Sequence, residues 1–155
     1  MAPNPAYRLR QALSADVDFL ADVVIAADDR RPTDFDEAAW RTGFADWTAS
    51  QLGDPEISTS VIEVDGEAVG RLRIARNAES IELCGIQLLP RVQGRGIGTA
   101  IIESLQSEAT GAGLPLDIGV EKDNPNARRL YERLGCRQIG ETDREYRLRW
   151  DPTTQ

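Results

Sequence analysis

The segment IELCGIQLLPRVQGRGIGTAIIESLQSEA, residues 81–109, decides the fold. Its pattern is typical of a strand, a glycine-rich turn and an amphipathic helix, in that order. Gly94, Gly96 and Gly98 take alternate positions in the turn, directly before the apolar period of the helix begins. Glycines let a backbone wrap closely around a ligand, and the free N–H groups of a helix N-terminus attract anions. The segment therefore predicts a pyrophosphate-binding loop.

Three kinds of phosphate-binding loop have glycine patterns of this sort. The P-loop requires a glycine followed by lysine, and no glycine of this chain is followed by lysine. The dinucleotide fingerprint G-x-G-x-x-G fits Gly94 and Gly96 but meets Thr99 at its third glycine, although Asp117 lies near the offset of the ribose carboxylate. The dinucleotide interpretation is weakened but stays open. The third pattern, Q-x-x-G-x-G, begins at Gln93 and is complete.

The composition, 41% hydrophobic and 28% charged, is that of a soluble globular protein. The length favours a single domain over residues 1–155 with a core large enough to fold alone. No apolar run is long enough to span a membrane, and the N-terminal segment MAPNPAYRLRQ lacks the apolar core of a secretion signal. We therefore expect a cytoplasmic protein in which Cys84 and Cys136 are reduced, packed thiols.

The chain has no histidine and a net charge of −8. The absence of histidine excludes histidine triads, histidine general bases and histidine metal ligands, and we expect no metal site. The negative charge argues against a nucleic-acid or anionic-membrane partner. It would favour a cationic substrate such as an amine, although the same charge equally serves solubility alone.

A short edge strand over Tyr7–Gln11 and two helices are expected at the start of the chain. Ser14 is the predicted N-cap of the first helix and Asp36 that of the second. On the second helix three aromatic residues share one face, which is more often core than binding surface. The alternative places this stripe beside an acceptor pocket. The stripe consists of Trp40, Phe44 and Trp47.

The dipeptide Asp65-Gly66 lies between the strand-like segments 60–64 and 67–76. It predicts a hairpin with a type I′ turn, because that turn needs positive φ at both central positions. Arg71 and Arg73 share one face of the second strand, and a solvated surface is their simplest interpretation.

The strand before the glycine loop is apolar at odd positions up to Leu83 and at even positions from Ile86. A regular strand cannot switch faces, so this pattern predicts a β-bulge near Cys84-Gly85. Burial on both sides of the strand is the alternative. After the loop, a helix from Ile97 is expected to end at glycines 111 and 113, before a further strand. A strand, helix and strand in this order predict a parallel pair in a mixed α/β sheet, with ligand at the C-terminal strand ends.

A second motif follows this unit. Residues 124–135 carry the pattern N-x-x-A-x-x-L-Y-x-x-x-G. Together with Gln93, Gly96 and Gly98, this motif resembles the signature of the GNAT-type N-acetyltransferases, and the likeness covers about residues 61–150. The resemblance implies a mixed, mostly antiparallel sheet of six to seven strands flanked by helices. It also implies a central parallel βαβ unit and a bulged strand at the acyl-CoA site.

The resemblance further implies acetyl-CoA as cofactor and a role for each matching residue. The backbone of Leu88 would pair with pantetheine, and Tyr131 would protonate the leaving thiolate as general acid. Direct attack by a neutral primary amine would be assisted by backbone N–H groups. Glu82 is the first candidate for the base that deprotonates the amine, with water as the alternative. The implied cofactor contacts are Leu88, Gln93, Gly94, Arg95, Gly96, Ile97, Gly98, Thr99, Asn124, Ala127 and Tyr131.

One position departs from the family pattern, because Cys136 stands where phenylalanine is usual. We expect this residue to pack rather than react. Two other classes of function stay open, a non-catalytic acyl-CoA-binding module and a dinucleotide-binding protein based on Gly94, Gly96 and Asp117. The acceptor, a small-molecule or peptide amine, is not identified by the sequence, and either a monomer or a homodimer is compatible with it.

Overall fold

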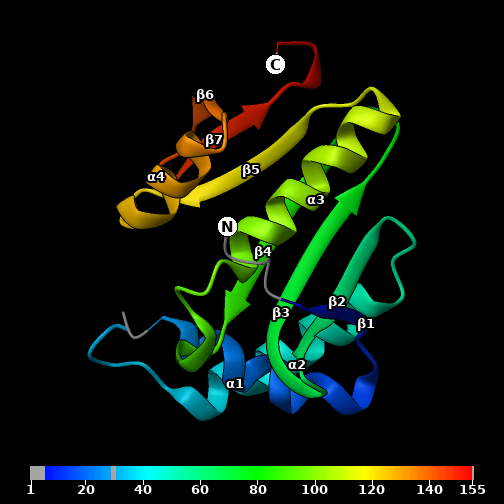
Figure 1. The fold of residues 1–155 in the computed structure, drawn as a ribbon. Helices are drawn as coiled ribbons and strands as arrows, with labels where there is room; N and C mark the ends of the chain where they lie inside the picture. The colour runs from blue at the N-terminus through cyan, green and yellow to red at the C-terminus, as the bar shows by residue number, and fades with distance from the viewer. Residues whose placement is uncertain (1–5, 29–30, 155) are drawn as a thin grey trace. The chain divides into compact units, whose positions relative to one another are not determined.

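The computed structural model describes residues 6–28 and 31–154. In this part of the chain seven strands form a sheet in the order β1-β2-β3-β4-β5-β7-β6 (Figure 1). The pairs β1–β2, β5–β7 and β6–β7 are antiparallel, and β4–β5 is parallel. The predicted mixed, mostly antiparallel α/β sheet is therefore confirmed. The strands are β1 (Arg8–Gln11), β2 (Ile57–Val64), β3 (Glu67–Arg76), β4 (Ile81–Leu88), β5 (Leu116–Glu121), β6 (Arg137–Glu141) and β7 (Glu145–Trp150).

Four α-helices accompany the strands in the described residues, with a 3-10 turn over Pro90–Val92 directly after β4. The chain divides into two compact units, of which the first holds residues 6–73 and 85–97 and the second residues 74–84 and 98–154. That residues 1–155 form a single acetyltransferase domain stays a prediction. The helices are α1 (Val17–Ala27), α2 (Glu37–Leu52), α3 (Ile97–Ala112) and α4 (Pro125–Arg133).

The first unit is built on a core between its helices and β2. Fully buried Leu20 of α1 and Val61 of β2 belong to one apolar cluster, and Phe44 of α2 packs against it. Burying side chains of this size contributes roughly 1.5–3 kcal/mol each. The core interpretation of the aromatic stripe is thus confirmed for Phe44. Trp47, at the end of the stripe, keeps 41% of its surface exposed.

The two predicted N-caps of the first unit have different outcomes. Asp36 caps α2 as predicted, because its Oδ1 accepts the N–H three residues later at 3.1 Å. Ser14 as the N-cap of α1 is wrong. A 3-10 turn precedes the helix, and the Asp16 carboxylate accepts the Leu13 N–H at 2.7 Å while pairing with Arg10 at 2.9 Å. A charge-assisted bond of this kind is stronger than one to a serine hydroxyl.

The β2–β3 hairpin turns as predicted, since Asp65 has φ of 53° and Gly66 has φ of 80°. Further along β3, Gly70 allows a close approach to β4. A Cβ at Gly70 would lie 2.7 Å from the carbonyl oxygen of Gln87 and 2.8 Å from a methyl carbon of Leu88. Any larger residue at position 70 would push the end of β4 away, so this glycine fixes where the glycine-rich loop starts.

The second unit contains the predicted parallel pair. Residues Ile81–Leu83 of β4 pair in register with Leu116–Ile118 of β5, and α3 lies between the two strands in sequence. Gly113, directly after α3, has φ of 68° and ends this helix as predicted, whereas Gly111, the other glycine expected at its end, lies inside the helix. Gly135 follows α4 with φ of 97°. The bulge near Cys84-Gly85 stays a prediction.

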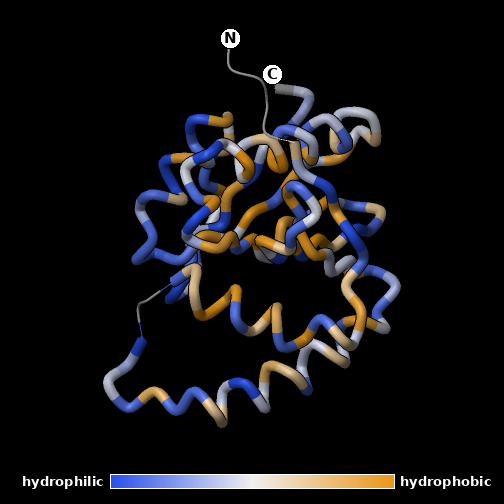
Figure 2. The backbone as a smooth tube through the Cα atoms, turned by 60° about the horizontal axis from the view of Figure 1, so that its bottom comes forward, coloured by the Kyte–Doolittle hydropathy of each residue, from blue (hydrophilic) through white to orange (hydrophobic). Residues whose placement is uncertain are grey.

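No helix of the described residues is both long and apolar enough to cross a membrane. Figure 2 shows the corresponding pattern, in which hydrophobic stretches of the backbone are short and alternate with hydrophilic ones. The prediction that the N-terminal segment is no secretion signal falls partly on residues 1–5, which lie outside the described residues.

Candidate functional site

The glycine-rich loop has the backbone conformation that its glycines predict. Gly94 and Gly96 have φ of 75° and 83°, a region that side chains with a Cβ rarely adopt. Residues 93–96 are exposed, whereas Ile97 keeps only 2% of its surface exposed and anchors the first turn of α3. The loop therefore presents backbone and the Arg95 guanidinium to solvent while its end is fixed in the apolar interior.

The N-terminus of α3 is open in the way a phosphate ligand requires. A Cβ added at Gly94 or at Gly98 would meet no atom within 4 Å. The first N–H groups of a helix have no intrahelical acceptor and attract negative charge, and successive turn N–H groups form an anion-binding nest. Half-buried Thr99 adds a hydroxyl to the first turn. These residues fit a pyrophosphate.

Two residues predicted to bind the cofactor lie together at the end of β4. The side-chain amide of Gln93 donates a hydrogen bond to the carbonyl oxygen of Leu88 at 2.9 Å. The next residue, Leu89, donates its N–H to the carbonyl of Val69 on β3 at 2.8 Å. The strand end is thus tied both to its neighbour and to the loop. The hydrogen bond from Gln93 also occupies part of the hydrogen-bonding capacity of the Leu88 backbone, which the resemblance assigns to pantetheine.

The second motif forms the start of α4. Asn124 is the N-cap, because its Oδ1 accepts the N–H of Ala127 at 3.2 Å, and Pro125 takes the first helical position. The side-chain amide hydrogens of Asn124 are not used in this cap, so they can still contact a ligand. The motif therefore caps α4 and also leaves donor groups for its predicted cofactor contacts.

Tyr131 lies on α4 with only 8% of its surface exposed. Burial raises the pKa of its hydroxyl above the ordinary 10, and neighbouring Cys136 adds to the shift. The Cys136 N–H donates to the carbonyl oxygen of Tyr131 at 3.0 Å. Burial also raises the pKa of the Cys136 thiol to about 11. Both groups are protonated near neutral pH, so Tyr131 can donate a proton and Cys136 packs as predicted.

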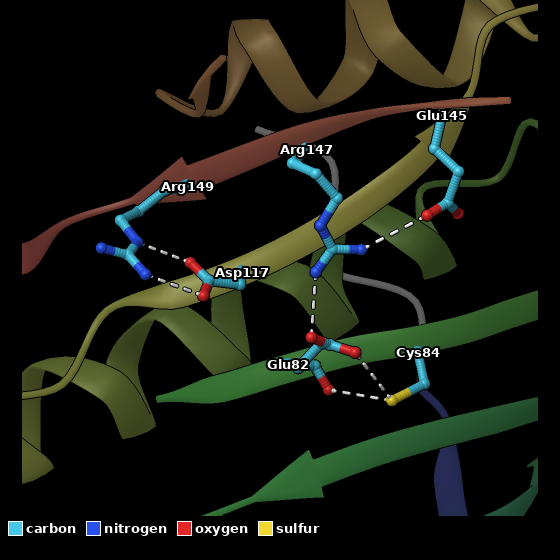
Figure 3. Close-up of polar contacts among 6 residues, drawn as sticks. All are labelled: Glu82, Cys84, Asp117, Glu145, Arg147 and Arg149. Atoms are coloured by element: carbon cyan, nitrogen blue, oxygen red, sulfur yellow. Dashed lines mark hydrogen bonds and ion pairs between the residues drawn. The ribbon is translucent and has the colours of Figure 1, made fainter. Parts of the chain in front are cut away.

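Glu82 takes part in a polar network that joins β4 and β7 (Figure 3). Its Oε1 accepts from Arg147 at 2.9 Å, and its Oε2 lies 3.5 Å from the Cys84 thiol. Arg147 also contacts Glu145 at 3.4 Å. Gly119 of β5 leaves the space for this arginine, since a Cβ there would lie 2.6 Å from its Nη1. The candidate base is therefore held by an ion pair that joins residues 65 positions apart.

Asp117, the carboxylate on which the dinucleotide interpretation rested, has a partner within the chain. Arg149 donates to both of its oxygens, at 2.7 and 3.0 Å (Figure 3). The two residues are directly opposite each other in the β5–β7 ladder. A carboxylate engaged in this bidentate way is poorly placed to accept hydrogen bonds from a ribose.

The interpretation of Arg71 and Arg73 as a solvated face is wrong for Arg71, which keeps only 5% of its surface exposed. Its guanidinium carbon lies 5.4 Å from the centroid of the Phe44 ring and 5.8 Å from that of Trp47. Alternation along β3 predicted the shared face correctly. That the aromatic side of α2 covers this face required knowledge of the tertiary packing.

Within residues 6–28 and 31–154, no group of three or more cysteine, aspartate or glutamate side chains is arranged to hold a metal ion. In the same residues a pocket of about 450 Å³ lies between the end of α2 and the start of β2. None of the predicted site residues lines it. Most of its lining residues lie between positions 52 and 60, in the end of α2, the loop that follows and the start of β2.

Comparison with solved structures finds the same fold. The PaiA N-acetyltransferase from Thermoplasma acidophilum in complex with coenzyme A is 13% identical, with a TM-score of 0.78 over 94% of this chain and 99% of that chain. An acetyltransferase from Thermus thermophilus is 19% identical, with a TM-score of 0.75 over 94% and 97%. The spermidine N-acetyltransferase from Vibrio cholerae in complex with CoA and spermine is 17% identical, with a TM-score of 0.69 over 95% and 96%.

The sequence itself matches the model of the acetyltransferase (GNAT) family over residues 21–136, which include the glycine-rich loop and α4. The fold and the loop define an acyl-CoA-dependent transferase. The chain belongs to the GNAT acetyltransferase family, and its class of activity is acetyl-CoA-dependent N-acetylation. The family assignment sets aside the dinucleotide interpretation.

Proposed function

We propose that the protein transfers the acetyl group of acetyl-CoA directly to the primary amine of a small molecule or peptide. The observation that carries this proposal is the exposed loop of residues 93–96 before α3, with positive φ at Gly94 and Gly96 and open space at Gly98. Acetyl-CoA supplies a thioester whose thiol, with a pKa of about 8.5, is already a fair leaving group. Binding, orientation and proton transfer are the tasks of the chain.

The residues that hold the cofactor are proposed along the loop and the two motifs. The backbone of residues 93–99 and the charge of Arg95 bind the pyrophosphate, and the backbone of Leu88 pairs with the pantetheine arm. Asn124 and Ala127 contact the cofactor further along that arm. Support comes from the exposure of the loop and from the unused amide hydrogens of the Asn124 cap.

Tyr131 is proposed as the general acid that protonates the leaving thiolate. Because burial raises the pKa of its hydroxyl, the residue stays protonated throughout the neutral range. At its ordinary pKa of 10 the hydroxyl is already a weaker acid than the thiol it protonates, and the shift widens this difference. Its contribution is therefore a hydrogen bond that strengthens as thiolate charge develops. We therefore assign it an assisting role rather than an essential one.

Glu82 is proposed as the base that accepts the proton of the amine, with water as the alternative. The ion pair with Arg147 fixes the position of its carboxylate, and 38% of its side-chain surface is exposed, so an amine can reach it. The same ion pair occupies one carboxylate oxygen, which leaves Oε2, beside Cys84, as the atom that accepts the proton.

The acceptor is proposed to be a small or peptide amine, and the spermidine N-acetyltransferases among the similar folds act on a compound of this kind. We also propose a cytoplasmic location, because both cysteines of the described residues are free thiols, as in a reducing compartment. Whether the protein is a monomer or a homodimer stays a prediction. Substrates and partners of nucleic-acid type are not proposed, given the net charge of −8.

The experiment that tests the function is an amine panel with acetyl-CoA, monitored by release of free thiol. We expect acetylation of at least one primary amine at a rate well above the hydrolysis of acetyl-CoA alone. Binding of acetyl-CoA without turnover on any amine would contradict the proposal and support a non-catalytic acyl-CoA-binding module instead.

A further inference from the structure

A cluster of two arginines and two aromatic rings lies in the first unit, outside the residues assigned to acetyl-CoA and proton transfer. We call Arg71, Arg73, Phe44 and Trp47 the arginine–aromatic cluster. The guanidinium carbon of Arg73 lies 4.4 Å from the centroid of the Trp47 ring, and that of Arg71 lies 5.8 Å from the same centroid. Two positive charges thus share one indole ring, and Trp47 keeps 41% of its surface exposed.

Two hydrogen bonds of this cluster go to neutral side-chain amides. Arg71 Nη1 donates to the side-chain oxygen of Gln87 at 2.8 Å, and Arg73 Nη2 donates to that of Gln51 at 2.8 Å. Within residues 6–28 and 31–154, Arg73 has no carboxylate in ion-pair distance, and its Nε is buried without a hydrogen-bond acceptor. A partly buried guanidinium without a carboxylate partner lowers the stability of the fold unless a bound anion compensates its charge.

Several other arginines on strands of this protein have their charge compensated by a carboxylate. Each of four has a carboxylate oxygen within 3.0 Å of a guanidinium nitrogen. Arg73 differs from them although it lies on the same strand as Arg76. The four paired residues are Arg10, Arg76, Arg147 and Arg149.

The cluster reaches the strand proposed to hold acetyl-CoA. Gly85 of β4 lies beside Arg71, and a Cβ at Gly85 would be 3.3 Å from Arg71 Nη1. Leu88, the proposed pantetheine partner, follows three residues later on the same strand, roughly 10 Å away at the ordinary rise of a strand. A small molecule bound at the cluster would therefore lie near this strand.

We propose that the arginine–aromatic cluster binds a carboxylate of the acceptor, so that the acceptor is an amino acid or a similar amine that carries a carboxylate. The inference rests on the proposed N-acetyltransferase function. A planar guanidinium matches a carboxylate in two parallel hydrogen bonds and also stacks on aromatic rings. The neutral amides of Gln51 and Gln87 hold the positions that the carboxylate takes. A carboxylate oxygen accepts a stronger hydrogen bond from a guanidinium than an amide oxygen does. A polyamine, in contrast, brings further positive charge, which the two arginines repel.

The test compares acceptors that differ only in the carboxylate. Thiol release is measured with the common amino acids, each beside its carboxamide, and with spermidine as an amine without carboxylate. We expect the preferred amino acid to exceed its carboxamide by at least about 10-fold in kcat/KM, mainly through KM. Arg73→Gln should bring this ratio close to one, because the carboxylate loses a charge-assisted bond and the carboxamide at most a neutral one. Arg76→Gln on the same strand is the matched control and should keep the ratio.

A second variant tests the cluster without removing a buried charge. Gln51→Glu places a carboxylate beside Arg73 and should also lower the preference for amino acids, because it occupies the same guanidinium. Acetyl-CoA affinity, measured by calorimetry, should stay unchanged in all three variants. Carboxamides or spermidine acetylated as well as amino acids, or an unchanged ratio in Arg73→Gln, would overturn this inference alone. No acetylation of any amine would overturn the proposed function together with it.

Discussion

Gln93 and Leu88 are joined by a hydrogen bond of 2.9 Å from the side-chain amide to the backbone carbonyl, which closes the turn between β4 and the glycine-rich loop. Both residues are proposed to bind acetyl-CoA. The bond therefore links the strand that would hold the pantetheine arm to the loop that would hold the pyrophosphate. Its donor is a neutral amide, and only a residue with a hydrogen-bond donor at this reach can replace it.

Replacing Gln93 by glutamate should weaken acetyl-CoA binding more than replacing it by alanine. Alanine removes one neutral hydrogen bond, worth about 1 kcal/mol or several-fold in affinity. Glutamate in addition points a negative charge at the Leu88 carbonyl and the pyrophosphate. Calorimetric affinities of the two variants provide the measurement. Wild-type affinity in Gln93→Glu would show that neither the hydrogen bond nor the local charge matters for the cofactor.

Tyr131→Phe should lower turnover by about 10- to 100-fold without changing the affinity for acetyl-CoA. A general acid typically contributes 100-fold or more, but a thiolate is a fair leaving group and needs less assistance. Because the pKa of Tyr131 is raised above 10, turnover of the wild type should not fall through loss of this proton below pH 10. Tyr146→Phe, in the same unit, is the control. Equal turnover in wild type and Tyr131→Phe would remove the acid role.

Glu82→Gln should flatten the acidic limb of the pH–rate profile, because an amide cannot accept the proton of the amine. Glu145 is the matched control, since it contacts the same arginine, Arg147, at 3.4 Å. Glu145→Gln changes the charge of the network equally but removes no proposed base, so its profile should keep the wild-type shape. If the two variants have the same profile, Glu82 acts only as a partner of Arg147 and water is the base.

Alkaline pH should destabilise the fold through Cys136. Burial raises the pKa of this thiol from 9.0 to about 11, so the folded state favours the neutral form. Its contribution to the free energy of unfolding is complete below pH 9 and is lost as the pH rises towards 11. Between pH 8 and pH 10 the loss should be about 1 kcal/mol. Urea unfolding of Cys136→Ala should lack this part of the pH dependence, whereas Cys84→Ala should retain it.

The parts of the fold that depend on neighbours in sequence could be predicted. The Asp65-Gly66 turn and the glycine-rich loop each need a particular backbone conformation that only a few residue types adopt. The N-cap at Ser14 failed because a tertiary contact decided it, the pairing of Arg10 with Asp16. Instead of the Ser14 hydroxyl, the Asp16 carboxylate accepts the hydrogen bond at the start of this turn, and Arg10 of β1 holds that carboxylate in place.

The candidate site divides in the same way. Its backbone part was predictable from the glycines, whereas its side-chain partners were not. The ion pair of Glu82 with Arg147 requires the register of β5 and β7, which no local pattern supplies. Arg71 was expected in solvent because alternation defines a face of a strand but not what covers that face. The aromatic stripe of α2 was the one available signal, and it covers this arginine.

The central claim is that the N-terminus of α3 binds the pyrophosphate of acetyl-CoA, and titration calorimetry of two alanine variants tests it most directly. Gly98 and Gly111 both lie in α3, and a Cβ at either would meet no protein atom within 4 Å. Neither replacement should lower thermal stability, because alanine is the better helix former. Wild type and Gly111→Ala should bind acetyl-CoA alike and not NAD, and Gly98→Ala should bind acetyl-CoA at least about 10-fold more weakly, as its methyl group fills the space of the ligand. Equal affinity in all three proteins would contradict the account.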